Sequence, residues 1–322
     1  MNLFTRLNFS FCIILLVCNA SLAQSYPALP ANNLQIAEKN YNLKFRWMAD
    51  SINKRLEPHA ALLLPVKLPG CSKVFYMQFD TGSPFTLFYK GKMKAIQQKY
   101  PEILTLNDSA VILQSNQFYV GAMPLGAKQI PIKENGSNEI NWKNKKAIEI
   151  IGTIGVDFFE NRVIAINYPA KQFFNGTAIP TKLSTEMVMN DFMFVRRSIL
   201  FPASIKGKKS ILFFDSGSSA FTLLTNKETA ELLAVPDAVA VVSKTKSWNR
   251  TMTAYTIPTT DIIGIAGKKL PLLSTTYMEG VSENQLAQMM RLGIGGLTGN
   301  QLFVNSVLII DAKNKKFGLR SK

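Results

Sequence analysis

Residues 76–83 read YMQFDTGS, and residues 211–218 read ILFFDSGS. These two stretches decide the fold, because each runs from apolar, strand-forming residues directly into an Asp-Thr/Ser-Gly-Ser turn. A single such triplet is an ordinary turn sequence, since Asp and Ser bond their own backbone and Gly adopts positive φ. Two of them, each after an apolar run, predict that the chain contains two copies of one unit.

The repeat extends outward from both turns. Upstream, residues 61–68 and 198–205 are strand-like and each meets a short turn, so two hairpins deliver the two Asp loops. Downstream, each loop is followed by a helix-like stretch that a proline closes. In the second copy we expect Thr225 to cap this helix, with Glu228 three residues on, as in a capping box.

The longest match comes last in each copy, where residues 152–173 and 296–317 align without a gap. A late helix is expected over residues 283–292, between a serine and a glycine. Short alternating or β-branched runs fill the space between, which favours mostly antiparallel β structure. These runs are residues 110–113, 117–120, 129–132, 252–257, 262–265 and 270–273.

The N-terminus predicts export. A basic start, an apolar run at residues 9–17 and small residues up to Ala23 are typical of a secretory signal peptide over residues 1–23. The apolar run is too short to span a bilayer comfortably. Cys18 would suggest lipidation instead, but a bulky residue precedes it. We expect a periplasmic or secreted protein with no transmembrane segment.

The remainder divides into an extension and two lobes. Residues 24–58, rich in Asn, Pro and charge, are predicted to form an N-terminal extension whose helical part, near residues 41–56, packs on the first lobe. The lobes are expected at residues 59–178 and 179–322, joined by the stretch 174–197. Each is large enough to bury a core without a disulfide, and we expect a monomer.

The charge distribution argues against a nucleic-acid-binding protein, and the cysteine content argues against a disulfide-bonded one. The formal net charge is +16 and the pI about 9.7, but the lysines are scattered and not interleaved with aromatic residues, so we expect no nucleic-acid binding. A basic surface could still attract anionic envelope polymers. Of the three cysteines only Cys71 lies beyond the signal peptide, so an internal disulfide is not expected.

With these motifs the chain resembles the aspartic proteases of the pepsin and retropepsin type. In that family each lobe has a strand, an Asp-Thr/Ser-Gly loop and a later apolar-apolar-Gly segment beneath the loop. Residues 150–152 fit that segment in the first lobe, and residues 292–296 offer it in the second. The resemblance covers roughly residues 59–320. It implies a mostly β fold of two similar β-barrel-like lobes with a few short helices.

The resemblance also implies a chemistry. Asp80 and Asp215 would meet between the lobes, where two buried carboxyl groups share one proton. One acts as base toward a water while the other polarises the scissile carbonyl. Because the pair titrates as a unit, the sequence assigns no separate role to either residue. No cofactor or metal is required.

The loop residues would support the pair. By resemblance, the hydroxyls of Thr81 and Ser216 would brace the two loops against each other across the lobe interface. Two further hydroxyls would bond the outer carboxylate oxygens, and two glycines would let backbone N–H groups approach the carboxylates. These are Ser83 and Ser218, and Gly82 and Gly217.

The family's flap, a hairpin with a Tyr near a Gly, is not evident. The candidate hairpin is residues 104–113, with its turn at residues 107–109, while Tyr119 falls on a following strand. In the second lobe Trp248 lies at the tip of residues 241–257. Tyr119 and Trp248 are therefore the candidate substrate contacts.

Other catalytic systems fit less well. His59 is the only histidine and Cys71 the only mature cysteine, which disfavours triads, dyads and the usual zinc sites. Asp157 and Glu160 form a local acidic pair, but Asn300 or Gln301 replaces Asp157 in the other copy, so we interpret Asp157 as a structural cap.

Two functions remain. The first is an exported aspartic endopeptidase acting on peptides or proteins through Asp80 and Asp215. The second is a non-catalytic protein of the same fold that binds peptides or anionic envelope polymers. Both intact Asp loops favour the enzyme, because a binding protein has no need of two neighbouring carboxylates that repel.

Overall fold

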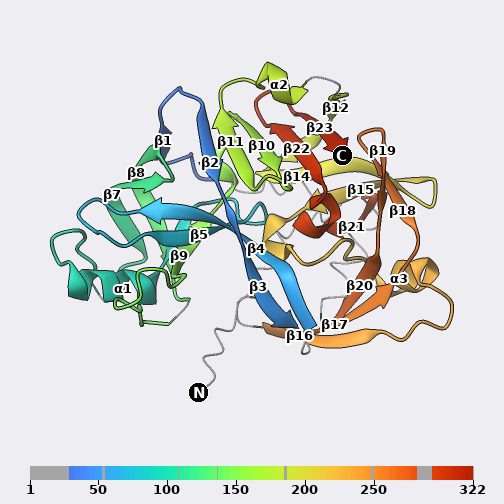
Figure 1. Ribbon diagram of the computed structural model, residues 1–322, viewed down its shortest axis with the longest axis horizontal. Coiled ribbons are helices and arrows are strands. Elements are labelled where there is room, and N and C mark those ends of the chain that lie inside the picture. Colours follow the sequence, from blue (N-terminus) through green and yellow to red (C-terminus); the bar gives the residue numbers. More distant parts are fainter. Residues whose placement is uncertain are drawn as a thin grey trace, which may run out of the picture.

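The computed structural model describes residues 29–52, 55–107, 109–135, 137–184, 187–247, 250–280 and 292–321. The predicted signal peptide, Trp248 and all but the last residue of the predicted helix at 283–292 lie outside these ranges. Strands dominate the described chain and form a first lobe, a second lobe and a sheet that bridges them (Figure 1). Among the described residues, no helix has the length and apolar character needed to cross a membrane.

The first-lobe sheet runs in the order β1-β8-β6-β9-β5-β4-β3, with β7 paired to β4 and β8. Its central pair, β5 and β9, is parallel, and its pairing register shifts between Tyr76 and Met77. The strands are β1 Leu34–Ile36, β3 Arg46–Ile52, β4 Arg55–Lys67, β5 Phe75–Phe79, β6 Leu87–Tyr89, β7 Ile112–Val120, β8 Met123–Lys133 and β9 Ile150–Ile154.

The second lobe repeats this centre. Its main sheet runs β19-β18-β14-β15-β21, and its parallel pair, β15 and β21, has the same register shift, between Ile211 and Leu212. A separate sheet, β16-β17-β20, lies beside it. The strands are β13 Met193–Val195, β14 Ser198–Ile205, β15 Lys208–Phe214, β16 Val241–Ser247, β17 Arg250–Pro258, β18 Ile262–Ile265, β19 Lys268–Pro271, β20 Ser274–Glu279 and β21 Ile294–Thr298.

The bridging sheet runs β12-β23-β22-β10-β11-β2 and lies between the lobes at the top of Figure 1. In its centre β10 pairs antiparallel with β22, and Ala165 lies opposite Ile309, its own counterpart in the repeat. The pseudo-twofold axis of the molecule therefore passes between these two strands. The strands are β2 Tyr41–Lys44, β10 Val163–Asn167, β11 Gln172–Gly176, β12 Asn190–Asp191, β22 Ser306–Asp311 and β23 Lys316–Ser321.

The α-helices of the described chain are α1 Lys90–Lys99, α2 Thr181–Ser184 and α3 Lys227–Leu233, and short 3-10 helices are η1 Val156–Phe158, η2 Ser216–Ser218 and η3 Asn300–Phe303. Two of them, α1 and α3, follow the Asp loops and end shortly before prolines, as predicted. The predicted cap of α3 is wrong: Asn226 caps the helix by accepting a hydrogen bond from the Thr229 N–H at 2.8 Å. The Thr225 hydroxyl instead donates to the carbonyl of Gly295 on β21, so this residue is bonded to the neighbouring strand and does not cap the helix.

The predicted helix near residues 41–56 is also wrong, because this part of the extension forms β2, β3 and the start of β4. Its apolar residues alternate with polar ones, as in a strand with one buried face. Leu43 and Phe45 are buried, and Trp47 is half-buried. The extension therefore belongs to the sheets, with β2 at the edge of the bridging sheet and β3 paired with β4.

Candidate active site

Each aspartate is delivered by the end of a buried strand. Asp80 directly follows β5, and its N–H donates to the Ile154 carbonyl on β9 at 3.0 Å. Asp215 directly follows β15, and its N–H donates to the Thr298 carbonyl on β21 at 2.9 Å. Equivalent bonds in equivalent sheets hold both loops, so the structure places the two aspartates symmetrically.

Reciprocal hydrogen bonds join the two loops. The Thr81 N–H donates to the Ser216 hydroxyl oxygen, and the Ser216 N–H donates to the Thr81 hydroxyl oxygen, both at 2.9 Å. Each hydroxyl then donates across the interface, Thr81 to the Phe214 carbonyl at 2.8 Å and Ser216 to the Phe79 carbonyl at 3.0 Å. All these groups are buried, so the lobes cannot separate here without leaving donors unsatisfied.

The glycines bring the two carboxyl groups together. A Cβ added at Gly82 would lie 2.6 Å from Asp215 Oδ1, and one added at Gly217 would collide with Asp80 Oδ1. Each carboxyl group thus packs over the glycine of the opposite loop. Any side chain at either glycine would push the aspartates apart, so glycine is required at both positions.

Burial and proximity perturb both aspartates. Neither has any exposed surface. Burial raises the pKa of Asp80, and the charge of Asp215 and the hydrogen bond to it raise this pKa further. Burial also raises the pKa of Asp215, whereas hydrogen bonds from Ser218 and Asp80 oppose that rise. The two groups therefore form one coupled acid pair.

The serines differ between the loops. The Ser218 hydroxyl donates to Asp215 Oδ2 at 2.8 Å, as the resemblance implies. The corresponding expectation for Ser83 is wrong, because its hydroxyl donates to the Phe85 carbonyl at 2.8 Å. The proline that follows Ser83 shapes this loop differently from the second one, where an additional serine, Ser219, follows Ser218.

A buried carboxylate supports the first loop from below. Asp157 accepts hydrogen bonds from the Thr86 N–H and hydroxyl at 2.8–2.9 Å, which agrees with its interpretation as a cap. Burial raises the pKa of Asp157 to about 6, despite these bonds and the charge of Arg197. Arg197 pairs with Glu160 at 2.7 Å and lies over the Phe85 ring at 4.7 Å. The sequence pattern did not identify this arginine.

A neutral group supports the second loop. The Asn300 amide donates to the Ser216 carbonyl at 2.9 Å and to the Ser219 hydroxyl at 3.0 Å. Its oxygen accepts a bond from the Tyr168 hydroxyl at 2.7 Å. Tyr168, fully buried beneath the site, was not identified from the sequence, because only the folded chain brings it to Asn300.

The predicted flap is wrong. Residues 104–107 and 109–111 form no strand, and the hairpin of this region is β7–β8, which turns at Gly121 and Ala122. Tyr119 lies on β7 opposite Pro124 and is 42 % exposed. Within the described ranges no hydrogen bond or ring contact joins Tyr119 to either Asp loop, and Trp248 lies outside those ranges.

The histidine and cysteine occupy structural positions. The His59 ring nitrogen Nδ1 lies 3.2 Å from the Gln301 side-chain oxygen. The backbone carbonyl of His59 accepts a hydrogen bond from the Ser219 hydroxyl. Cys71 lies in the turn after β4, where its N–H donates to the Leu68 carbonyl. The two are thus held by different neighbours and form no dyad.

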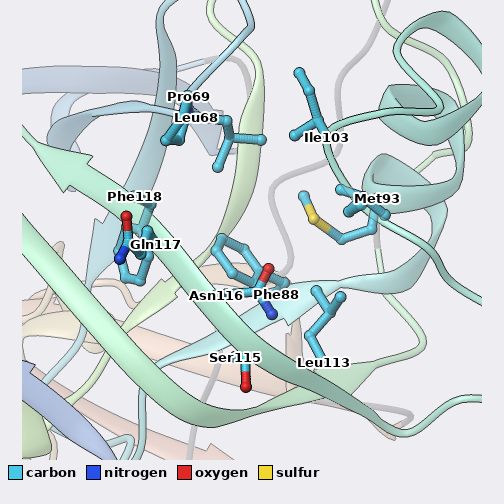
Figure 2. Close-up of a pocket in the computed structure, with 11 residues that line it drawn as sticks. Leu68, Pro69, Phe88, Met93, Ile103, Leu113, Ser115, Asn116, Gln117 and Phe118 are labelled. Atoms are coloured by element: carbon cyan, nitrogen blue, oxygen red, sulfur yellow. The ribbon is translucent and has the colours of Figure 1, made fainter.

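A cavity of about 270 Å³ lies elsewhere in the first lobe (Figure 2). Its lining includes apolar side chains such as Phe88 and Met93 and the polar side chains of Ser115, Asn116 and Gln117 on β7. None of its lining residues belongs to an Asp loop, so this cavity is separate from the aspartate pair.

Comparisons with known proteins bear on the fold. No protein-family model and no curated protein sequence matches the chain. Among solved structures, the chain is similar to the crystal structure of aspartic proteinase from Irpex lacteus, with a TM-score of 0.50 and 10 % sequence identity. The match covers 88 % of this chain and 97 % of that one. At this identity the similarity concerns the fold alone: the chain has a mostly β, two-lobed, pepsin-like fold.

Proposed function

We propose that this chain is an aspartic endopeptidase that hydrolyses peptide bonds through Asp80 and Asp215. The observation that carries the proposal is the meeting of two fully buried carboxyl groups whose loops are locked together by reciprocal hydrogen bonds. Two ionised carboxyl groups in one buried site would raise the free energy of the folded protein, and this cost is avoided when the two groups share one proton. A shared proton is what acid–base activation of a water requires.

The reaction needs no group beyond the chain and water. A water held between the carboxyl groups loses a proton to the ionised aspartate as its oxygen attacks the peptide carbon. The protonated aspartate gives its proton to the carbonyl oxygen, which forms a neutral gem-diol. As the diol collapses and the C–N bond breaks, the protonated aspartate gives its proton to the leaving amine, and the ionised aspartate takes a proton from one diol hydroxyl, which leaves a carboxylic acid and restores the shared proton of the pair.

Cleavage of a peptide library by the chain from Gln24 onward, followed by mass spectrometry across pH 3–7, tests this function. Asp80→Asn and Asp215→Asn should each lower the rate by about 10³-fold or more, since each removes one half of the acid–base pair. Cys71→Ser is the control, and its rate should be unchanged because the thiol lies in a turn outside the pair. Cleavage that survives both Asp variants would refute the proposal.

The rival function, binding without catalysis, makes a different prediction. Its support is the net charge of +16, which would hold anionic polymers by attraction that salt screens. A binding protein would show no cleavage at any pH and salt-sensitive retention on an anionic polymer. Retention of Asp80→Asn and Asp215→Asn would equal that of the wild type.

Export is part of the proposal. Its support is the signal-like sequence over residues 1–23. Fractionation of cells expressing the full chain should find the protein outside the cytoplasm, with an N-terminus at Gln24. Incorporation of a labelled fatty acid that Cys18→Ser abolishes would instead show a lipoprotein.

A further inference from the structure

We propose that the 270 Å³ cavity of the first lobe is a binding site for an uncharged, largely apolar small molecule of about ten non-hydrogen atoms. This size follows by proportion, since an engineered apolar cavity of about 150 Å³ binds benzene. The cavity is separate from the aspartate pair, so the site is independent of the proposed peptidase function.

The cavity is lined mainly by side chains that are themselves buried (Figure 2). Phe88, Met93 and Phe118 are each 1 % exposed, and Leu104 and Leu113 are also buried. They come from β6, α1, β7 and the segment before β7, so the fold itself assembles this space. Protein interiors seldom leave voids larger than a water molecule, and an empty apolar cavity destabilises the folded state in proportion to its volume. A cavity of this size therefore indicates an occupant.

Water is a poor occupant for this lining. A buried water typically makes about three hydrogen bonds, whereas the side chains of Phe88, Leu104 and Leu113 offer only apolar surface. Phe88 and Phe118 stand edge to face with ring centroids 5.5 Å apart. The flexible thioether of Met93 adapts to irregular apolar shapes and makes favourable contacts with aromatic rings. These side chains therefore suit an aromatic ring or a short alkyl chain.

The cavity reaches the protein surface beside β7, because the lining residues Pro69, Ser115 and Gln117 are exposed. Ser115 has a φ of +46° in the middle of this strand, and the pairing with β8 passes from Gln114 to Asn116 without it. A residue other than glycine is strained in this left-handed region, and such strain persists where the surrounding structure imposes it. The strand thus departs from regular geometry where it lines the cavity, and the exposed residues give a ligand a route from solvent.

The lining carries no formal charge. The chain has 37 Lys and Arg and 21 Asp and Glu residues, yet none of the described residues around this cavity is among them. An ion taken into such a site would lose its hydration without gaining a counter-charge. The polar groups present are the Ser115 hydroxyl and the side-chain amides of Asn116 and Gln117, which form hydrogen bonds with neutral groups. The site therefore favours a neutral ligand with an apolar body.

Methyl NMR of the chain from Gln24, labelled with ¹³C at the methionine methyl groups, tests the site directly. Indole and 1-octanol, both close to the expected size, are the probes, and Met93→Leu assigns the Met93 signal. At least one probe should shift this signal saturably and give intermolecular NOEs to it. At about 100 times its Kd, that probe should raise the Tm by about 4 °C. If neither probe shifts the Met93 signal up to its solubility limit, the cavity holds water alone and the inference is overturned.

Filling the cavity distinguishes this site from any other on the protein. Leu113→Phe adds a larger side chain to the lining and should weaken probe binding by at least about tenfold. Leu232→Phe, the same change at a side chain of α3 that is 64 % exposed, is the matched control and should leave the affinity unchanged. Should Leu113→Phe fail to fold, Ile103→Phe makes the same test at a lining residue that is only half-buried. Unchanged binding in a folded filling variant would mean that the probe binds elsewhere, which contradicts the inference.

Octanoate tests the charge of the ligand, because it adds a carboxylate to a chain of the same length as 1-octanol. In about 0.5 M salt, which screens the net charge of +16, octanoate should bind more weakly than 1-octanol. Equal or tighter binding of octanoate would overturn the assignment of an uncharged ligand. A chain that binds the probes but cleaves no peptide would refute the peptidase and retain this site.

Discussion

Trp47 stacks on Tyr168 with ring centroids 6.0 Å apart and planes 9° from parallel. Tyr168 in turn donates to Asn300, which holds the Ser216 carbonyl in the second Asp loop. The N-terminal extension is thereby connected to the candidate active site through a buried aromatic residue.

Tyr168→Phe should destabilise the protein by about 1–3 kcal/mol, because it leaves the buried Asn300 oxygen without its donor. Urea unfolding followed by tryptophan fluorescence measures the change. Tyr119→Phe is the control, since an exposed tyrosine on β7 should alter stability by no more than about 0.5 kcal/mol. Equal effects from both variants would contradict a specific role for the Tyr168 hydroxyl.

The extension should remain attached in the working protein rather than be removed as a propeptide. The β2 strand pairs with β11, and the Arg162 guanidinium, which is almost fully buried, donates to the carbonyls of Ala37 and Lys39. A chain beginning at residue 55 would lose these partners, so two guanidinium nitrogens of a buried cation would lose their acceptors and only the bond from Arg162 Nε to Asn175 would remain.

We therefore expect the chain beginning at residue 55 to be insoluble or unfolded by circular dichroism, whereas the chain beginning at Gln24 folds. Intact mass of the purified, folded protein should include the extension. A folded and fully stable protein that lacks residues 24–54 would show that the extension is dispensable.

The sequence correctly predicts those structural features that depend on short-range patterns of apolar and turn-forming residues. Apolar strands that run into Asp-Thr/Ser-Gly turns predict the two loops, and β18 spans Ile262–Ile265 as expected. The family resemblance implies that residues 150–152 and 292–296 lie beneath the Asp loops, and the structure pairs Gly152 and Gly296 with the strands that carry the aspartates. The loops and β18 are encoded by neighbours in the chain, whereas the pairing of the two glycines is not.

The wrong or missing predictions have two causes. In some segments the polar composition hid the period of the apolar residues, and elsewhere the structure depends on contacts between residues far apart in the sequence. In the extension, polar composition masked the strand alternation of Tyr41, Leu43, Phe45 and Trp47. The β7–β8 turn was missed although Gly121, with φ of +59°, marks it. The bond between Tyr168 and Asn300 joins residues 132 positions apart, and no local pattern signals it.

Thr81→Ala should cost about 2–4 kcal/mol of stability, because it leaves the buried Ser216 N–H and Phe214 carbonyl unsatisfied. Thr81→Ser should cost much less, since it keeps the hydroxyl. Chemical unfolding measures both, and a double-mutant cycle with Ser216→Ala should give a coupling free energy of about 0.5–3 kcal/mol. A coupling of zero would mean that the reciprocal bonds do not hold the loops together.

Asp157 should make stability depend on pH. Burial raises its pKa from 3.8 to about 6, so the folded state binds the proton more tightly than the unfolded state does. The resulting stabilisation is fully present below pH 3.8 and is lost as the pH rises to about 6. At 1.36 kcal/mol per pH unit, this amounts to about 3 kcal/mol.

The free energy of unfolding of the wild type should fall between pH 4 and 6, and Asp157→Asn should remove up to about 3 kcal/mol of that fall. Comparison with the wild type at each pH isolates this effect from Asp80 and Asp215, whose raised pKa values act in the same direction in both proteins. Asp237→Asn, at an exposed turn, controls for the loss of one negative charge and should keep the wild-type slope. Because Asp157 holds Thr86 in the first Asp loop, an unchanged slope in Asp157→Asn would mean that this carboxyl is not a titrating support of the site.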